Sequence, residues 1–149
     1  ITDGQPRTDR CVTRFQQAKT QASPHFVVGR AGEVVQLVKL EDRAWHDSGR
    51  NGVSVGIEHV ARTPGELGPD DAGLPLTEEQ LAASAALVSW LLGHLDLGLD
   101  AVVGHYTNPQ SSHHDCGLGD DATTGGGRRG IWPWDRYKQM IQKELDKNA

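Results

Sequence analysis

The segment from Thr77 to Leu97 constrains the fold most, because its pattern fits a helix that must bury one apolar face. Thr77 followed by Gln80 forms a capping box, and two glutamates, Glu78 and Glu79, stand in the first turn, where the helix dipole favours them. One face would carry Leu81, Ala85, Val88, Leu91, Leu92 and Leu95, and Gly98 is placed to end the helix. Such a face needs another layer of structure to cover it.

Shorter segments predict the layers around this helix. Two further helices are expected, from about Arg7 to Ala22 and from Trp134 to about Lys147. The expected strands are His25–Gly29, Glu33–Val38, Val53–Val60 and the short buried run Ala101–Gly104, with a tight turn at Arg30–Gly32. Helices interleaved with strands predict an α/β fold, a single domain with a central mixed β-sheet flanked by helices.

Composition excludes several classes of protein. A chain of 149 residues fits one domain. Fifteen Lys and Arg against 20 Asp and Glu argue against a nucleic-acid partner, and no apolar run is long enough to span a membrane. Two cysteines cannot support a disulfide-dense scaffold, although pairing of Cys11 with Cys116 stays open. We expect a monomer without a membrane span.

The seven histidines raise the possibility of a metal site, since His is the commonest metal ligand. His105 follows the expected strand 101–104, at the end where α/β sheets place their ligands. A cluster of His113, His114, Asp115 and Cys116 comes about ten residues later, and these residue types suit zinc. The residues alone fit a zinc site and a solvated polar loop about equally.

Glu58 stands beside apolar residues in an expected strand. If it were buried, its pKa would rise toward that of a general base, but a water-facing glutamate at a strand edge is slightly favoured. Period-two alternation places His59 on the opposite face. Trp45 and His46 are expected to form a pocket wall, His25 is as easily structural, and His94 has no assigned function.

Several segments together resemble the type 2 N-acetylmuramoyl-L-alanine amidase family, which includes phage lysozyme-type amidases and peptidoglycan recognition proteins. The resemblance runs from Ile1 to about Gly117. The segments that carry it are Ser23–Val28, Gly32–Val38, Ala44–His46, Asn51–Glu58 and Gly104–His105. Each alone is weak, whereas their order and spacing together are highly specific.

The resemblance implies hydrolysis of the amide between N-acetylmuramic acid and the L-alanine of the stem peptide, with Zn²⁺ as cofactor and peptidoglycan or muropeptides as substrate. His105 and Asp115 match zinc ligands, Glu58 matches the catalytic glutamate, and His113 matches the group that faces the oxyanion. Trp45 and His46 would bind the substrate. The location implied is the cell wall, reached by a secreted or periplasmic protein or by a phage lysin.

The sequence departs from the family pattern in three places. Cys116 with His114 competes with Asp115 and His113 for the ligand and oxyanion roles, and the spacing from His105 favours Asp115. Pro24 stands where some relatives have a catalytic tyrosine, which supports Glu58. The family's first zinc ligand would precede Ile1, so residues 1–149 are expected to form the domain without its first strand. A non-catalytic peptidoglycan-binding module is the alternative function, and a zinc-free interaction domain is a third.

Overall fold

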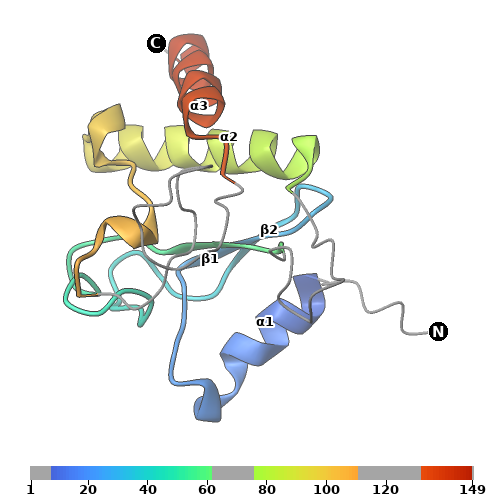
Figure 1. Ribbon diagram of the computed structural model, residues 1–149, viewed down its shortest axis with the longest axis vertical. Coiled ribbons are helices and arrows are strands. Elements are labelled where there is room, and N and C mark those ends of the chain that lie inside the picture. The colour runs from blue at the N-terminus through green and yellow to red at the C-terminus, as the bar shows by residue number, and fades with distance from the viewer. Residues whose placement is uncertain (1–7, 62–75, 111–131, 149) are drawn as a thin grey trace.

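The computed structural model describes residues 8–61, 76–110 and 132–148. Its helices and strands are α1 (Thr8–Gln16), β1 (Phe26–Val28), β2 (Val34–Gln36), β3 (Ile57–His59), α2 (Glu78–Leu95) and α3 (Trp134–Asn148), with 3₁₀ turns η1 (Ala18–Thr20), η2 (Leu99–Ala101) and η3 (His105–Thr107). Helix α1 contacts the sheet on one face, α2 covers the other, and α3 packs on α2 (Figure 1). The predicted α/β fold with a mixed sheet is confirmed.

The sheet has the order β2–β1–β3, in which β1 pairs antiparallel with β2 and parallel with β3. The turn between β1 and β2 lies where the sequence predicts it, and Gly32 adopts a φ of +83° there. The strand predicted from Val53 is shorter in the structure. Val53 donates its backbone N–H to Arg50 (3.0 Å), so this part of the run closes a turn, and the strand begins only at Ile57.

Helix α2 begins as predicted and ends differently. The Thr77 hydroxyl caps it by accepting the Gln80 backbone N–H at 3.1 Å. The Gln80 side chain does not complete the capping box; it is buried and donates to the carbonyls of Val28 and Val60. Asp96, not Gly98, takes the left-handed conformation at the C-terminus (φ 54°). Leu95, placed by the sequence on the apolar face, is 40% exposed.

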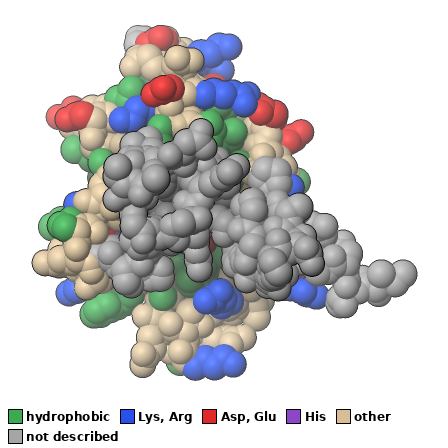
Figure 2. All heavy atoms as spheres, in the orientation of Figure 1, with side chains coloured by type: hydrophobic (Ala, Val, Ile, Leu, Met, Phe, Trp, Pro, Cys, Tyr) green, Lys and Arg blue, Asp and Glu red, His purple; other side chains and the backbone are tan. Residues whose placement is uncertain are grey.

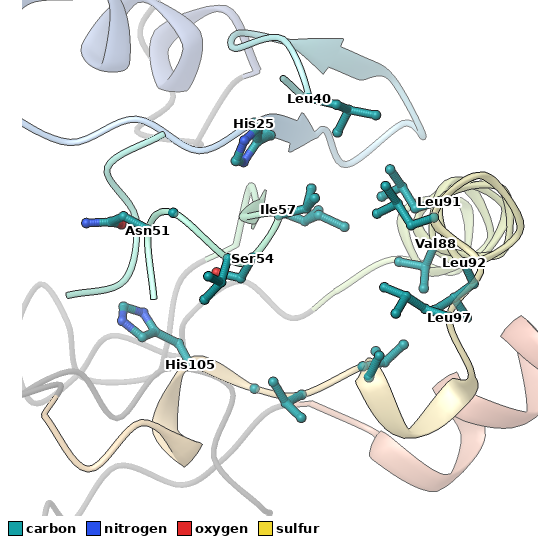
Figure 3. A pocket seen from close by; sticks show the side chains of 18 of the residues that line it. His25, Leu40, Asn51, Ser54, Ile57, Val88, Leu91, Leu92, Leu97 and His105 are labelled. Carbon is teal, nitrogen blue, oxygen red and sulfur yellow. The ribbon is translucent and has the colours of Figure 1, made fainter. Parts of the chain in front are cut away.

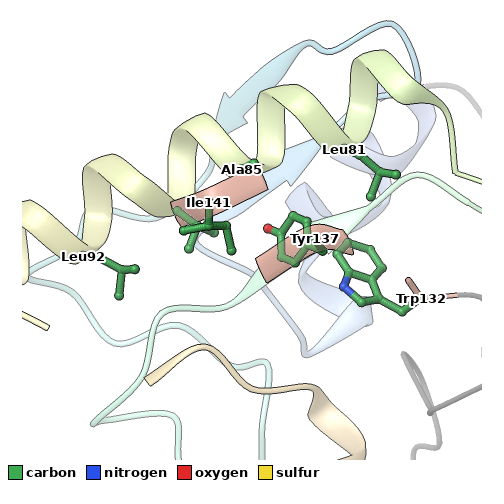
Figure 4. Packing of buried hydrophobic residues seen from close by; sticks show 7 residues of the cluster. Leu81, Ala85, Leu92, Trp132, Tyr137 and Ile141 are labelled. Carbon is green, nitrogen blue, oxygen red and sulfur yellow. The ribbon is translucent and has the colours of Figure 1, made fainter. Parts of the chain in front are cut away.

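The hydrophobic core lies mainly between α2 and α3. Its buried members are Leu81, Ala85, Val88, Leu92, Trp132, Tyr137 and Ile141 (Figure 4). Ile57 of β3 and Leu145 of α3 are partly buried and pack against this cluster. The predicted apolar face of α2 is therefore confirmed except at its last residue. Among the described residues, no helix is both long and apolar enough to cross a membrane.

The predicted buried strand before His105 is wrong. The amides of Ala101 and Val102 donate to Gly98 and Leu99 (3.0 and 3.2 Å), which closes the 3₁₀ turn η2. Val103 is 57% exposed, so this apolar run is not a core strand. His105 begins η3 instead of ending a strand. The helix expected at 7–22 is likewise shorter, because α1 ends at Gln16 and the separate 3₁₀ turn η1 begins at Ala18.

Candidate functional site

A cavity of about 750 Å³ lies between β3, α2 and the segment 101–105. Its apolar end is formed by leucines of α2 and the residues after it, and its polar end by His105, Asn51 and His25 (Figure 3). Strand β3 is the edge strand of the described sheet, and its residues Ile57 and His59 line this cavity. Charged side chains of both signs gather over α2 and α3 on the face shown in Figure 2.

His105 is the predicted zinc ligand that the structure describes, and it is held against a carboxylate. Its Nε2 lies 3.3 Å from Oδ1 of Asp47. The same oxygen accepts the Nδ2–H of Asn108, which also donates to the Ser48 carbonyl at 2.7 Å. The turn 46–51 and η3 are therefore joined through polar contacts at the polar end of the cavity.

The turn that carries Asp47 is itself fixed. The Oδ1 atom of Asn51 accepts the backbone N–H groups of His46 and Asp47, both at 2.7 Å. Arg50 donates to the hydroxyl (3.2 Å) and the carbonyl (3.3 Å) of Thr107, which makes a second link from this turn to η3. Two side chains of one turn thus hold the segment that contains His105.

His25 and His46 serve the scaffold. The Nδ1 of His25 accepts the Gly56 N–H (3.1 Å), and its Nε2 donates to the Asp42 carbonyl (3.2 Å), so both ring nitrogens are engaged. His46 donates to the Ser54 carbonyl at 3.3 Å and its ring lies directly over Gly56, where a Cβ would collide with it. Burial lowers the pKa of His46.

Trp45 and His46, predicted to form a pocket wall, do not line this cavity. The Trp45 side chain is exposed and stacks with the Arg43 guanidinium, 4.4 Å from the ring centroid. A substrate-binding role for Trp45 and His46 stays a prediction.

Glu58 occupies the middle of β3, opposite Val27 in register, and is exposed. Ile57 packs against the core beneath α2, so the alternation predicted for this strand is confirmed and Glu58 lies on the other face. Burial and the Glu58 charge together raise the pKa of Cys11 in α1 to about 11. Glu58 does not line the cavity that His105 lines, and its catalytic role stays a prediction.

His59 is partly buried and packs against the core. Its Nε2 lies 2.7 Å from the Ser84 hydroxyl, which lies 2.6 Å from the Tyr137 hydroxyl, so three elements share one hydrogen-bonded chain. The ring packs edge-on against Trp132, with centroids 4.5 Å apart. Burial lowers the pKa of His59 to about 3.

The remaining predicted site residues, His113, His114, Asp115 and Cys116, lie outside the described residues. In the described part of the chain, no three His, Cys, Asp or Glu side chains form a group that could hold a metal. His105 nevertheless fits a zinc ligand, because metal-ligating histidines present their second nitrogen to a carboxylate or carbonyl, as His105 does to Asp47. The sequence reading missed Asp47 and Asn108, because their contacts span about 60 residues and no local motif marks them.

Comparison with known proteins agrees with this architecture. The catalytic domain of XlyA and a mutant endolysin from Bacillus subtilis are similar in structure. Each has a TM-score of 0.60 and 21% identity, over 91% of this chain and 75% of the other. This likeness shows the fold.

Sequence comparison identifies the family. N-acetylmuramoyl-L-alanine amidase A of Achromobacter lyticus is 33% identical over 52 residues, which are 34% of this chain and 29% of the relative's length. The match therefore spans less than a third of that relative. The family model Amidase_2, described as N-acetylmuramoyl-L-alanine amidase, matches residues 2–118. The chain belongs to the N-acetylmuramoyl-L-alanine amidase family.

Proposed function

We propose that this protein hydrolyses the amide bond between N-acetylmuramic acid and L-alanine in peptidoglycan or muropeptides, with Zn²⁺ as its cofactor. The match to the amidase family over residues 2–118 carries the proposal, because that range includes Glu58, His105, His113 and Asp115. The contact between His105 and the buried Asp47 carboxylate supports the zinc assignment. The protein would act on the cell wall, as a secreted or periplasmic enzyme or a phage lysin.

In the proposed mechanism, His105 and Asp115 would hold the zinc. Bound there, zinc would polarise the amide carbonyl and make water acidic enough to react near neutral pH. Glu58 takes the proton of the attacking water and passes it to the departing amine of L-alanine. Protonated His113 donates to the oxyanion, so this contribution falls as His113 loses its proton at higher pH.

The exposed position of Glu58 on β3 is compatible with the proton-transfer role, since a general base must reach both water and substrate. Trp45 also fits a role at the substrate, because its exposed indole offers a flat apolar surface to a sugar ring or peptide. Neither role requires the apolar end of the cavity.

The test measures the release of stem peptides with a free L-alanine N-terminus from purified peptidoglycan, by mass spectrometry. Glu58→Gln should lower turnover by roughly 10²–10⁴-fold, the usual contribution of a general acid–base group, while zinc content stays the same. Glu79→Gln is the matched control, since Glu79 is an exposed carboxylate in the first turn of α2. Turnover by Glu58→Gln equal to that of the control would remove Glu58 from the mechanism.

Two further measurements decide between the function classes. Removing zinc with a chelator should stop the release of peptide, and adding zinc should restore it. Sedimentation with peptidoglycan but no peptide release, with zinc present, would instead identify a non-catalytic binding module. Parallel assays with intact wall and soluble anhydromuropeptides establish which substrate is preferred.

A further inference from the structure

Asp47 is a buried carboxylate that the proposed mechanism does not use. Its exposed fraction is only 8%, and it lies in the turn that approaches η3. Removing a carboxylate from water is costly unless hydrogen-bond donors replace the lost solvent. Here Asn108 Nδ2 donates to Oδ1 of Asp47, His105 Nε2 lies 3.3 Å from the same oxygen, and Arg50 lies 4.0 Å from Oδ2. Two of the three belong to η3 or the residue after it.

The contact with Asp47 determines which nitrogen of His105 carries the proton. The Asp47 oxygen lies 3.3 Å from Nε2, so its negative charge attracts a proton on Nε2 and would repel a lone pair there. A neutral imidazole that is protonated at Nε2 carries its lone pair on Nδ1, and a metal binds the nitrogen with the lone pair. The Asp47 contact therefore also determines which nitrogen can ligate.

We propose that Asp47 is a positioning residue for His105, which holds the imidazole as the Nε2–H tautomer and aims Nδ1 at the metal. The inference rests on the proposed function, because it takes His105 as a zinc ligand. Asp47 acts through His105 and has no contact with the reacting atoms. Buried carboxylates behind metal-ligating histidines orient the ring and raise its basicity, and losing one costs about 10–100-fold in metal affinity.

Asp47 could instead serve only to join the turn to η3, and the structure contains a control for this reading. Arg50 makes a parallel link from the same turn to Thr107, with hydrogen bonds of 3.2 and 3.3 Å, and lies farther from Asp47 than His105 does, at 4.0 Å. If the link alone matters, Asp47→Leu and Arg50→Gln should have similar effects. If the imidazole is positioned, only the Asp47 variant should affect metal binding.

The experiment uses the full-length protein and two readouts that need no enzyme activity. The tautomer of His105 is read from the ¹⁵N shifts of its ring nitrogens in the metal-free protein, at a pH where the ring is neutral. Zinc affinity is measured by competition with a chelator. The variants are Asp47→Leu, which removes the acceptor; Asp47→Asn, which retains an acceptor oxygen without the charge; and Arg50→Gln.

Wild type and Arg50→Gln should show the Nε2–H tautomer and equal zinc affinity. Asp47→Leu should show mixed tautomers and bind zinc about 10–100-fold more weakly. Asp47→Asn should keep the Nε2–H tautomer and bind zinc more tightly than Asp47→Leu, though more weakly than wild type. This variant still tests the inference if Asp47→Leu fails to fold. An Nδ1–H tautomer in wild type, or equal affinity losses in Asp47→Leu and Arg50→Gln, would overturn the inference. A wild-type protein that binds no zinc would overturn the proposed function instead.

Discussion

The partly buried imidazole of His59 makes the stability of this protein depend on pH in a predictable way. In the folded state its pKa is lowered to about 3, from an ordinary value of 6.5, because burial disfavours the charged ring. Its described partners, Ser84 and Trp132, carry no charge that could compensate. Between pH 6.5 and 3 the unfolded chain therefore binds more protons than the folded chain at this site. Stability is present in full above pH 6.5 and falls as the pH falls.

The size of the loss follows from these two pKa values. Protonation of His59 stabilises the unfolded state, so it lowers the free energy of unfolding by about 0.2 kcal/mol at pH 7 and about 2 kcal/mol at pH 5. The difference, about 2 kcal/mol, would shift a urea midpoint by about 1 M for a protein of this size. His59→Gln removes the titration and keeps a side chain that can bond to Ser84.

The assay is urea unfolding at pH 7 and pH 5, followed by tryptophan fluorescence and far-ultraviolet circular dichroism. Wild type should lose about 2 kcal/mol more than His59→Gln between the two pH values. Each protein is compared with itself, so a general destabilisation by the substitution cancels, as do the titrations of all other groups. Equal losses in the two proteins would refute the argument that His59 is held neutral by burial.

Two further predictions address the cap of α2 and the surroundings of Glu58. Thr77→Val removes the hydroxyl that caps α2 and should lower the free energy of unfolding by about 1 kcal/mol. The control Thr13→Val, at an exposed position of α1, should leave the free energy of unfolding unchanged. Equal urea midpoints for the two variants would contradict this prediction. Cys11, with a pKa of about 11, should react with iodoacetamide about 100-fold more slowly at pH 8 than a free thiol with a pKa of 9.0. Glu58→Gln should speed that reaction, measured by peptide mapping, because the Glu58 charge helps to raise the pKa; an unchanged rate would place Glu58 away from α1.

Local sequence signals predicted the features that depend on local chemistry. The cap at Thr77 and the alternation along β3 both follow from spacing of a few residues, and both are confirmed. Gln80 shows the limit of such signals. Its position fits a capping box, but its side-chain amide donates to the carbonyls of Val28 and Val60. These residues are 52 and 20 positions away from Gln80 in the chain. A tertiary partner replaced the local one, and the sequence does not show which partner is available.

Two predictions for the chain before His105, the strand Ala101–Gly104 and the end of α2 at Gly98, are wrong for the same reason. An apolar run such as Ala101–Gly104 fits a strand only if neighbouring strands take its backbone groups. Here the amides of Ala101 and Val102 donate three residues back, and Asp96 ends α2 before the predicted glycine is reached. The local hydrogen bonds are satisfied within the segment, so His105 enters the site from a 3₁₀ turn.

The role of Asp47 was beyond sequence reasoning for a further reason. In the sequence it is one acidic residue in a polar stretch, which usually indicates a solvated loop. Burial changes its chemistry, because a carboxylate without water needs donors and so constrains every group that supplies one. Asn108 donates to Asp47 and His105 lies 3.3 Å from it, and in our proposal this contact sets the tautomer of His105. The residues that resemble the family's motif thus depend on a neighbour outside that motif, and the metal affinity of the Asp47 variants measures how strongly.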